Sequence, residues 1–306
     1  MSKVIVLGSF NVDLTGRTPH FPQPKETVLG STFAMGPGGK GFNQAVAAHK
    51  AGADIVTVCK IGNDPFQNII LDTMQQLNMR QDYLFRSHTN TGCALILVNE
   101  TTAENEILVL PGANNTFTKE DIDSLENIIM EAEYVLLQLE INQDANEYIV
   151  ELCKKHHTKV IVNTAPYNQI SDQFLSKIYM VTPNEIEAEQ LTGIHVCDFE
   201  SASQAAKIFK SKGVRNVIIT MGSQGAFISS EGIEKMIPAY KVNAVDTTGA
   251  GDGFNGGLLA SLSKGKTIWE AATFASALAA LSVQKQGASS SMPTLEEINK
   301  FIEDNQ

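Results

Sequence analysis

Short apolar runs alternate with longer amphipathic segments along most of the chain. Residues 4–7 are all apolar and are followed by Gly8, a pattern typical of a parallel strand buried on both faces. Further strands are predicted at 55–59, 134–139, 159–163, near 181 and at 216–220, and helices up to Ala51 and at 65–77, 118–132, 143–156, 184–193, 267–283 and from Thr294. Strands and helices that take turns predict an α/β fold, in which helices cover both faces of a mostly parallel central sheet.

Two stretches interrupt this alternation. The first is rich in proline and contains a short alternating piece at 27–33, without any helical period. In the second, two apolar runs between 92 and 110 flank a polar turn and predict a hairpin. We expect the two insertions, at about 14–35 and 89–110, to form a small sheet beside one large domain that spans 1–306. Extra edge strands on the main sheet are the alternative.

A glycine-rich stretch at 246–253 precedes an apolar run at 254–262. Gly249, Gly251 and Gly253 let backbone amides come close together, and the helix that follows favours negative charge at its N-terminus. This combination predicts a phosphate-binding site. Asp252 would repel a phosphate there unless it meets the ligand's reacting proton or a metal. We therefore interpret Asp252 as a catalytic base.

A second glycine-rich stretch, at 36–43, formally matches the GxGxxG pattern. A dinucleotide site is rejected because the next strand ends in Cys59 and Lys60, where an acidic residue would be needed to bind the ribose. A Walker A loop is rejected because Lys40 is followed by Gly41 rather than by Ser or Thr. What remains is a glycine turn whose amides, with Asn43 on the first helical turn, can approach hydroxyl groups closely.

Polar residues follow several predicted strands. Asn11 and Asp13 come just after the first strand, and Glu140 directly follows the strand at 134–139. Ligands of open α/β sheets bind at the carboxyl ends of the strands, so these side chains are candidates for binding a polyhydroxyl substrate. The alternatives are an Asx turn at Asn11 and Asp13, and a solvated loop acid at Glu140.

Two motifs later in the chain remain ambiguous from local pattern. Asn184 and Glu187 share one face of a first helical turn, where they would either order magnesium-bound water around a phosphate or cap the helix. The glycines that follow Thr220, at Gly222 and Gly225, either leave room for a purine and its phosphates or make a tight turn.

Composition narrows the functional class. The chain has 306 residues, 43% hydrophobic and 19% charged, as in a folded globular protein. Its formal charge of −11 argues against binding of nucleic acid, which needs a basic surface. Without an apolar run of membrane-spanning length or a signal-peptide pattern, we expect a cytosolic protein that spans no membrane. The spacing of its four cysteines and six histidines indicates neither disulfides nor zinc.

Taken together, these motifs resemble the ribokinase-like (PfkB) family of carbohydrate kinases. The residues that carry the resemblance are Asn11-Val-Asp13, Gly38-Gly39-Lys40-Gly41-Phe42-Asn43, Asn184-x-x-Glu187 and Asp246-Thr-Thr-Gly-Ala-Gly-Asp252. The resemblance covers essentially the whole chain. It implies a three-layer, Rossmann-type sandwich with a small β-sheet lid, and transfer of phosphate from ATP to ribose, which gives ribose 5-phosphate. A ketohexose or a nucleoside is the alternative substrate.

The resemblance also implies roles for single residues. Asp252 would be the base, beside an anion hole formed by Gly249, Ala250 and Gly251. The implied sugar-binding residues are Asn11, Asp13, Gly39, Lys40, Gly41, Asn43, Glu140 and Asp252; the implied nucleotide-binding residues are Asn184, Thr220, Gly222, Gly225, Gly251 and Ser276. Glu187 would hold Mg²⁺ through water, and a monovalent cation, usually K⁺, would lie at Asp246, Thr248, Ser282, Lys285, Gly287 and Ser291. Lids of two subunits commonly pack together in the family, which implies a homodimer.

Three residues depart from the family pattern. Phe42 stands where a small residue is usual, Ser276 where Asn is frequent near the nucleotide, and Lys25 where the lid turn often has Gly. We expect these departures to affect the choice of sugar more than the reaction.

Overall fold

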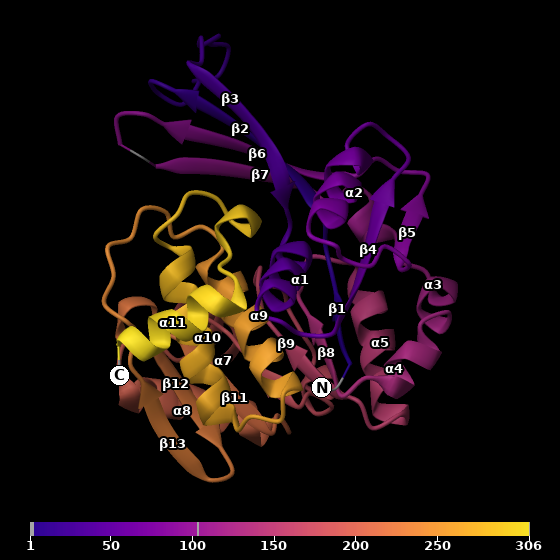
Figure 1. The fold of residues 1–306 in the computed structure, drawn as a ribbon, viewed down its shortest axis with the longest axis vertical. Helices are drawn as coiled ribbons and strands as arrows, with labels where there is room; N and C mark the ends of the chain where they lie inside the picture. Colours follow the sequence, from indigo (N-terminus) through magenta and orange to yellow (C-terminus); the bar gives the residue numbers. More distant parts are fainter. Residues whose placement is uncertain (1–2, 103, 306) are drawn as a thin grey trace.

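The structure is a computed structural model that describes residues 3–102 and 104–305. Its main body consists of a central sheet between two layers of helices, and a smaller sheet projects from the top of the view (Figure 1). None of the described helices is long and apolar enough to cross a membrane.

The described residues form a nine-stranded main sheet in the order β13-β12-β11-β10-β9-β8-β1-β4-β5. The strands are β1 (Val4–Leu7), β4 (Ile55–Gly62), β5 (Leu84–Ser87), β8 (Tyr134–Leu137), β9 (Lys159–Val162), β10 (Met180–Val181), β11 (Asn216–Thr220), β12 (Ala226–Ser230) and β13 (Ile233–Ile237). Neighbouring strands are parallel except that β12 runs antiparallel to β11 and β13. The predicted parallel sheet is thus confirmed.

Each face of the main sheet packs against its own hydrophobic core. Val4 and Val6 of β1 belong to one core, and Ile5 and Leu7 to the other, because successive side chains of a strand point to opposite faces. The first core is covered by α1 (Lys40–Lys50), α2 (Gln67–Gln76), α9 (Ala250–Ser263), α10 (Ile268–Ser282) and α11 (Leu295–Asp304). The second is covered by α3 (Lys119–Asp123), α4 (Glu126–Glu131), α5 (Gln143–Lys155), α6 (Asp172–Leu175), α7 (Glu185–Thr192) and α8 (Phe199–Ser211).

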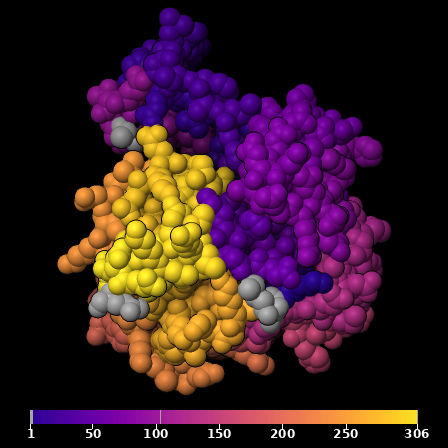
Figure 2. Space-filling view, viewed as in Figure 1, coloured from indigo at the N-terminus to yellow at the C-terminus, as the bar shows by residue number. Residues whose placement is uncertain are grey.

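The smaller sheet is separate from the main sheet, so the alternative of extra edge strands is wrong. Its order is β3-β2-β6-β7, from β2 (Asn11–Thr18), β3 (Thr32–Gly38), β6 (Gly92–Asn99) and β7 (Asn105–Leu110). The space-filling view shows its N-terminal strands projecting from the main body (Figure 2). The hairpin of β6 and β7 is confirmed.

Within this sheet, two sequence expectations need correction. The strand expected at 27–33 instead begins at Thr32 and runs to Gly38, because that register pairs it with β2. Pro37 is tolerated there because β3 is an edge strand. Asn11 and Asp13 lie within β2 rather than in a turn after β1. Lys25 has a φ of 74°, in the left-handed region that favours glycine.

Local pattern also missed some helical features. The helix expected over 118–132 is two helices, separated at Ser124 and Leu125, and the hydroxyl of Ser124 donates to the carbonyl of Asp121 at 2.6 Å. Thr118 and Asp121 form a capping box at the start of α3. Helix α8 was not predicted, although its buried residues Ala202, Ala205, Ala206 and Phe209 have helical spacing.

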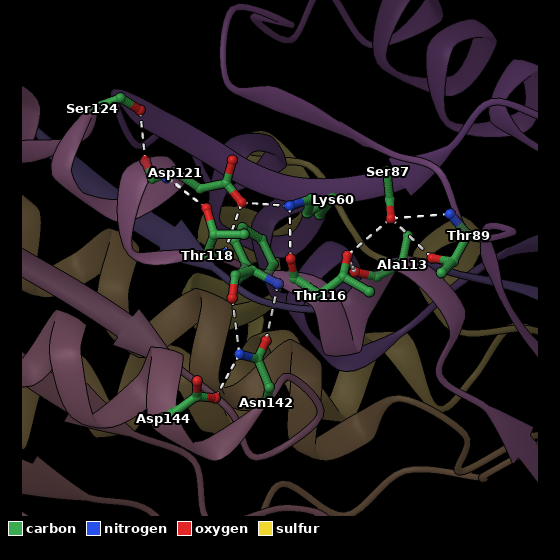
Figure 3. Close-up of polar contacts among 11 residues, drawn as sticks. Lys60, Ser87, Thr89, Ala113, Thr116, Thr118, Asp121, Ser124, Asn142 and Asp144 are labelled. Atoms are coloured by element: carbon green, nitrogen blue, oxygen red, sulfur yellow. Dashed lines mark hydrogen bonds and ion pairs between the residues drawn. The ribbon is translucent and has the colours of Figure 1, made fainter.

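A buried ion pair joins the sheet to the α3 layer. Lys60 of β4 is 5% exposed, and its ammonium group donates to the carboxylate of Asp121 and to the carbonyl oxygen of Thr116, the latter at 2.7 Å (Figure 3). Asp121 also accepts from the backbone N–H of Thr118 at 2.9 Å. One carboxylate therefore both caps α3 and neutralises the buried cation.

We expect Lys60→Met to lower the free energy of unfolding by about 3 kcal/mol, because Asp121 would keep its charge without the paired cation. The measurement is urea unfolding followed by circular dichroism. Lys119→Met is the matched control, since Lys119 forms a 3.5 Å ion pair with Asp123 on the surface of α3, the helix that contains Asp121. No measurable loss is expected in the control. Equal stability of the two variants would contradict a stabilising role for the Lys60 pair.

Candidate active site

The direction of the chain connections reverses at β1, which has β8 on one side and β4 on the other. In open α/β sheets, such a point leaves a crevice at the carboxyl ends of the strands, where ligands bind. Ser9, Glu140, Asn163 and Thr182 each follow a strand at this edge, and hydrogen bonds link them to α1 or α9. The edge is thus lined by polar side chains.

Helices α1 and α9 cross at a glycine contact that defines one wall of this region. A Cβ atom at Gly256 would lie 2.5 Å from the Cβ of Ala47 and 2.6 Å from the carbonyl oxygen of Gln44, so only glycine fits. This close approach brings the first turn of α9 against the first turn of α1. As a result, Asn43 Nδ2 donates to Asp252 Oδ2 at 3.0 Å, and Gln44 Nε2 donates to Asp252 Oδ1 at 2.9 Å.

Asp252 is 6% exposed and lies in the first turn of α9. The helix begins after Gly249, whose φ of 76° is in the left-handed region, and no side chain caps it. A Cβ at Gly251 would meet no atom within 4 Å, so the backbone there is open to a ligand. The N–H of Ala250 donates to the carbonyl of Thr247 at 3.2 Å. A buried carboxylate thus stands beside a helix N-terminus that attracts anions.

The predicted sugar-side residues lie at the N-terminal ends of β2 and α1 and in the loop after β8. The backbone N–H of Lys40 donates to Glu140 Oε2 at 2.9 Å, and the Ser9 hydroxyl donates to the same oxygen. Asn114 Nδ2 donates to Asn11 Oδ1 at 2.8 Å, so the oxygen of the Asn11 amide is engaged within the protein. Gly39 caps α1, and the N–H of Gly41 donates to the Ser9 hydroxyl at 3.3 Å.

Several carboxylates share this region with one ammonium group. Burial, together with the charges of Glu140 and Asp252, raises the pKa of Asp13 to about 6. Burial lowers the pKa of Lys40, but the carboxylates of Asp252, Glu140 and Glu187 outweigh it and leave that pKa raised. Burial likewise raises the pKa of Glu187. Lys40 therefore stays charged and offsets part of the negative potential.

On the other side of Asp252, Asn184 caps α7. Its side chain accepts from the N–H of Glu187 at 2.8 Å, while Glu187 Oε2 accepts from the N–H of Asn184 at 3.1 Å, so the helix-cap alternative is present. Glu187 is 8% exposed and also accepts from the Thr164 hydroxyl at 3.2 Å. Thr220 pairs with Asn184 in an isolated bridge. A capping role does not prevent the carboxylate of Glu187 from facing a phosphate.

The remaining nucleotide-side candidates lie farther along the same edge. Gly222 begins a short 3₁₀ turn, η2 (Gly222–Gln224), and Gly225 follows it. The N–H of Met221 donates to the carbonyl of Gly225 at 2.7 Å. Ser276 is buried in α10, which packs against β12. The glycines therefore form a tight turn, and the same turn leaves open space at Gly222, where the nearest atom to an added Cβ is 3.9 Å away.

The loop that precedes α9 is tied to the loop that follows α10. Asp246 accepts from the N–H groups of Thr248 and Gly287, each at 2.9 Å. Burial raises the pKa of Asp246, but these hydrogen bonds outweigh it and lower that pKa overall. The Ser282 carbonyl accepts from the N–H of Lys285, whose ammonium group instead pairs with Glu297 at 3.0 Å. Ser291 is buried in η3 (Ser289–Ser291).

Phe42, the first departure from the family pattern, is fully buried and packs edge-on against Phe10, with ring centroids 5.3 Å apart. Both aromatic rings belong to the core under β2 and α1. The larger side chain is thus accommodated below the turn that carries Lys40 and Asn43.

Sequence reasoning missed several polar residues that organise the site. Asn163 directly follows β9 and Ser9 lies two residues after the end of β1, so the rule that singled out Glu140 could have found them. Gln44 and Asn114 carried no such local signal, because their roles depend on partners 208 and 103 residues away in the chain.

Comparison with known proteins agrees with this geometry. Residues 1–295 match the model of the pfkB family of carbohydrate kinases. A ribokinase from Haemophilus influenzae is 40% identical over 299 residues, which cover 97% of each chain. A deoxyribokinase from Salmonella typhi is 35% identical over 301 residues, which cover 98% of each chain.

Solved structures show the same fold. The structure of Arabidopsis thaliana ribokinase complexed with ribose and ATP matches with a TM-score of 0.91 and 30% identity, and the match covers 99% of each chain. The chain therefore belongs to the PfkB family of carbohydrate kinases, within which it is a sugar kinase of the ribokinase type.

Proposed function

We propose that this enzyme transfers the γ-phosphoryl group of ATP to the 5-hydroxyl of D-ribose and releases D-ribose 5-phosphate. The observation that carries the proposal is the position of Asp252, a buried carboxylate held by two amide side chains at the open, glycine-capped start of α9. The ribokinase relatives support ribose as the acceptor.

In this proposal, the sugar lies between β2, the start of α1 and the end of β8. Asn11, Asp13, Gly39, Lys40, Gly41, Asn43 and Glu140 bind its hydroxyl groups. Asp252 takes the proton of the 5-hydroxyl as that oxygen attacks the phosphorus. Phosphoryl transfer depends mainly on alignment and charge stabilisation, and a positioned general base typically contributes a factor of roughly 10² to 10⁴.

The charge that develops on the transferred group is stabilised by Gly249, Ala250 and Gly251. The dipole of α9 favours an anion at this point, and the absence of a side chain at Gly251 lets the backbone approach the phosphate. Ala250 would exchange its 3.2 Å bond with Thr247 for a bond to the phosphate. Lys40 supplies the nearby positive charge.

For the nucleotide, we propose contacts with Asn184, Thr220, Gly222, Gly225, Gly251 and Ser276. A divalent cation fits beside Glu187, whose buried carboxylate offers the oxygen ligand that Mg²⁺ prefers, through water. When bound, Mg²⁺ neutralises charge on the β- and γ-phosphates. Glu187 itself is held in place by Asn184 and Thr164.

We also propose a monovalent-cation site, for K⁺, at Asp246, Thr248, Ser282, Lys285, Gly287 and Ser291. The residues fit such an ion because Asp246 joins the two loops that carry them, and these loops offer carboxylate and carbonyl oxygens. When bound, the cation would supply positive charge behind the anion hole. Lys285 would contribute its backbone, since its side chain pairs with Glu297.

The small sheet is proposed to act as a lid over the sugar and as a dimer interface. It carries many exposed apolar side chains, namely Phe33 (70%), Met35 (52%), Leu95 (40%), Ile107 (56%), Leu108 (57%), Val109 (45%) and Leu110 (45%). A second copy of the sheet would remove this surface from water. We further propose a cytoplasmic location, where ATP is available and the four free cysteines stay reduced.

A second candidate acceptor is 2-deoxyribose, because the deoxyribokinase from Salmonella typhi is also similar over nearly the whole chain. The two sugars differ only in the 2-hydroxyl, so a site that binds this hydroxyl through buried polar groups would discriminate against deoxyribose. Ketohexoses and nucleosides remain broader alternatives.

The function is tested with purified protein, ATP, Mg²⁺ and a panel of ribose, 2-deoxyribose, fructose and adenosine. We expect the highest kcat/KM for ribose in potassium, and a lower rate when sodium or tetramethylammonium replaces it. ADP release measures turnover, and the product is identified by mass spectrometry and NMR. A higher kcat/KM with another acceptor would contradict ribose as the substrate. Equal rates in all three salts would contradict the proposed cation site.

Asp252→Asn should lower kcat by about 10²- to 10⁴-fold, because an amide cannot accept the hydroxyl proton. Ribose affinity, measured by calorimetry, should stay within a few-fold because the shape of the side chain is kept. Asp144→Asn, at the exposed first turn of α5, is the control and should retain full turnover. An active Asp252→Asn enzyme would exclude Asp252 as the base.

For the lid, Leu108→Asp should shift the protein from dimer to monomer in sedimentation velocity, because a carboxylate would be buried in the apolar contact. Met130→Asp is the matched control, since Met130 is also 57% exposed but lies on α4, away from the small sheet. Identical sedimentation of the parent and of both variants would contradict dimerisation through the lid.

A further inference from the structure

Gln44 has a side chain that is fully buried and makes contacts only within the protein. Its Nε2 donates to Asp252 Oδ1 at 2.9 Å and to Asn163 Oδ1 at 3.0 Å. Its Oε1 accepts from Gln138 Nε2 at 2.6 Å. Both amide hydrogens and the amide oxygen therefore have partners, and Gln44 offers no free group to a substrate.

The direction of the Gln44 amide is determined by its neighbours. A carboxylate only accepts hydrogen bonds, so the nitrogen of Gln44 must face Asp252. Asn163 requires the same orientation, because its Nδ2 donates to the carbonyl of Thr182 at 3.0 Å and its Oδ1 is left to accept. A reversed amide would set oxygen against oxygen at both contacts. Gln44 thus holds Asp252 Oδ1 in one place.

Asn43 contacts the other carboxylate oxygen but differs from Gln44 in one respect. Its Nδ2 donates to Asp252 Oδ2 at 3.0 Å, whereas its Oδ1 is buried and has no hydrogen-bond partner among the described residues. Buried polar atoms are nearly always paired in native proteins. Gln138 Oε1 and Asn146 Oδ1 are also unpaired, but of these three amides Asn43 is the one that donates to Asp252, so its oxygen is the one placed to gain a partner when the substrate binds.

From this difference, we propose that Gln44 is a positioning residue that anchors Asp252 Oδ1, so that Oδ2 is the oxygen that receives the proton. The inference rests on the proposed function and deepens it. When the sugar binds to Asn43, the hydrogen bond from Asn43 to Asp252 Oδ2 breaks and this oxygen becomes available. The hydroxyl O–H bond then breaks as the O–P bond forms, its proton passes to Oδ2, and the bond from phosphorus to the bridging oxygen breaks with its electron pair leaving on ADP.

The test compares two substitutions that each remove one glutamine amide of similar burial. Gln44→Met removes the bond to Asp252 and keeps the length of the side chain. Gln138→Met removes a bond to Gln44 but none to Asp252, and Gln138 is equally buried. Both variants disturb the same core, so a purely structural effect should be similar in the two. Thermal unfolding is measured for each.

We expect Gln44→Met to lower kcat by about 10- to 100-fold, because a poorly positioned base loses part of its catalytic contribution. The KM for the sugar should change less than about threefold. Gln138→Met should keep kcat within about threefold of the parent. Equal losses of kcat in both variants, or a rise of KM without loss of kcat in Gln44→Met, would overturn the proposal. An inactive parent enzyme would overturn the proposed function and this inference with it.

Gln44→Glu provides a second measurement if Gln44→Met does not fold, because it keeps the shape of the side chain. Two adjacent carboxylates would then share a proton. The other charged groups around Asp252, namely Lys40 of α1, Asp13 of β2 and Glu187 of α7, are the same in both proteins. The rise of kcat with pH should therefore move to higher pH than in the parent, and an unchanged profile would contradict the role of Gln44.

Discussion

The contact between α1 and α9 is the constraint on which the rest of the site depends. At Gly256, the absence of a side chain lets the backbone of one helix lie against Ala47 and Gln44 of the other. Any Cβ there would push the helices apart, and Asp252, one turn away, would lose both amide donors. A packing requirement between two helices thus becomes a requirement on the direction in which the buried carboxylate of Asp252 faces.

An acidic protein that binds an anionic ligand must offset its own negative charge at the site. The chain carries a net charge of −11, and several carboxylates face the crevice. The compensation is local: it comes from the ammonium group of Lys40, which those carboxylates keep charged, and from the N-terminal end of α9, where Gly249 provides no capping side chain. Because both lie within the crevice, a ligand bound there would meet these charges at short range, where water and salt screen them least.

Much of the site was visible from the sequence because parallel sheets present their carboxyl ends at a single edge. Any polar residue that directly follows an apolar strand is placed there by topology, which is why Glu140 could be singled out before its neighbours were known. The same reasoning did not extend to Gln44, which lies inside an Ala-rich helix and looks like one more polar residue of a helix surface. Only packing shows that this position is fully buried.

The sequence by itself determined the types of most elements, the glycine-rich start of α9 and the identity of Asp252 as a candidate base. These properties are local, since they follow from periodicity, capping and backbone freedom over a few residues. The tertiary structure confirmed the separate sheet that the two insertions predicted, and it alone decided which amide holds each oxygen of Asp252. Asn43 and Asp252 are 209 positions apart, and no local pattern encodes a contact that arises only when two helices pack.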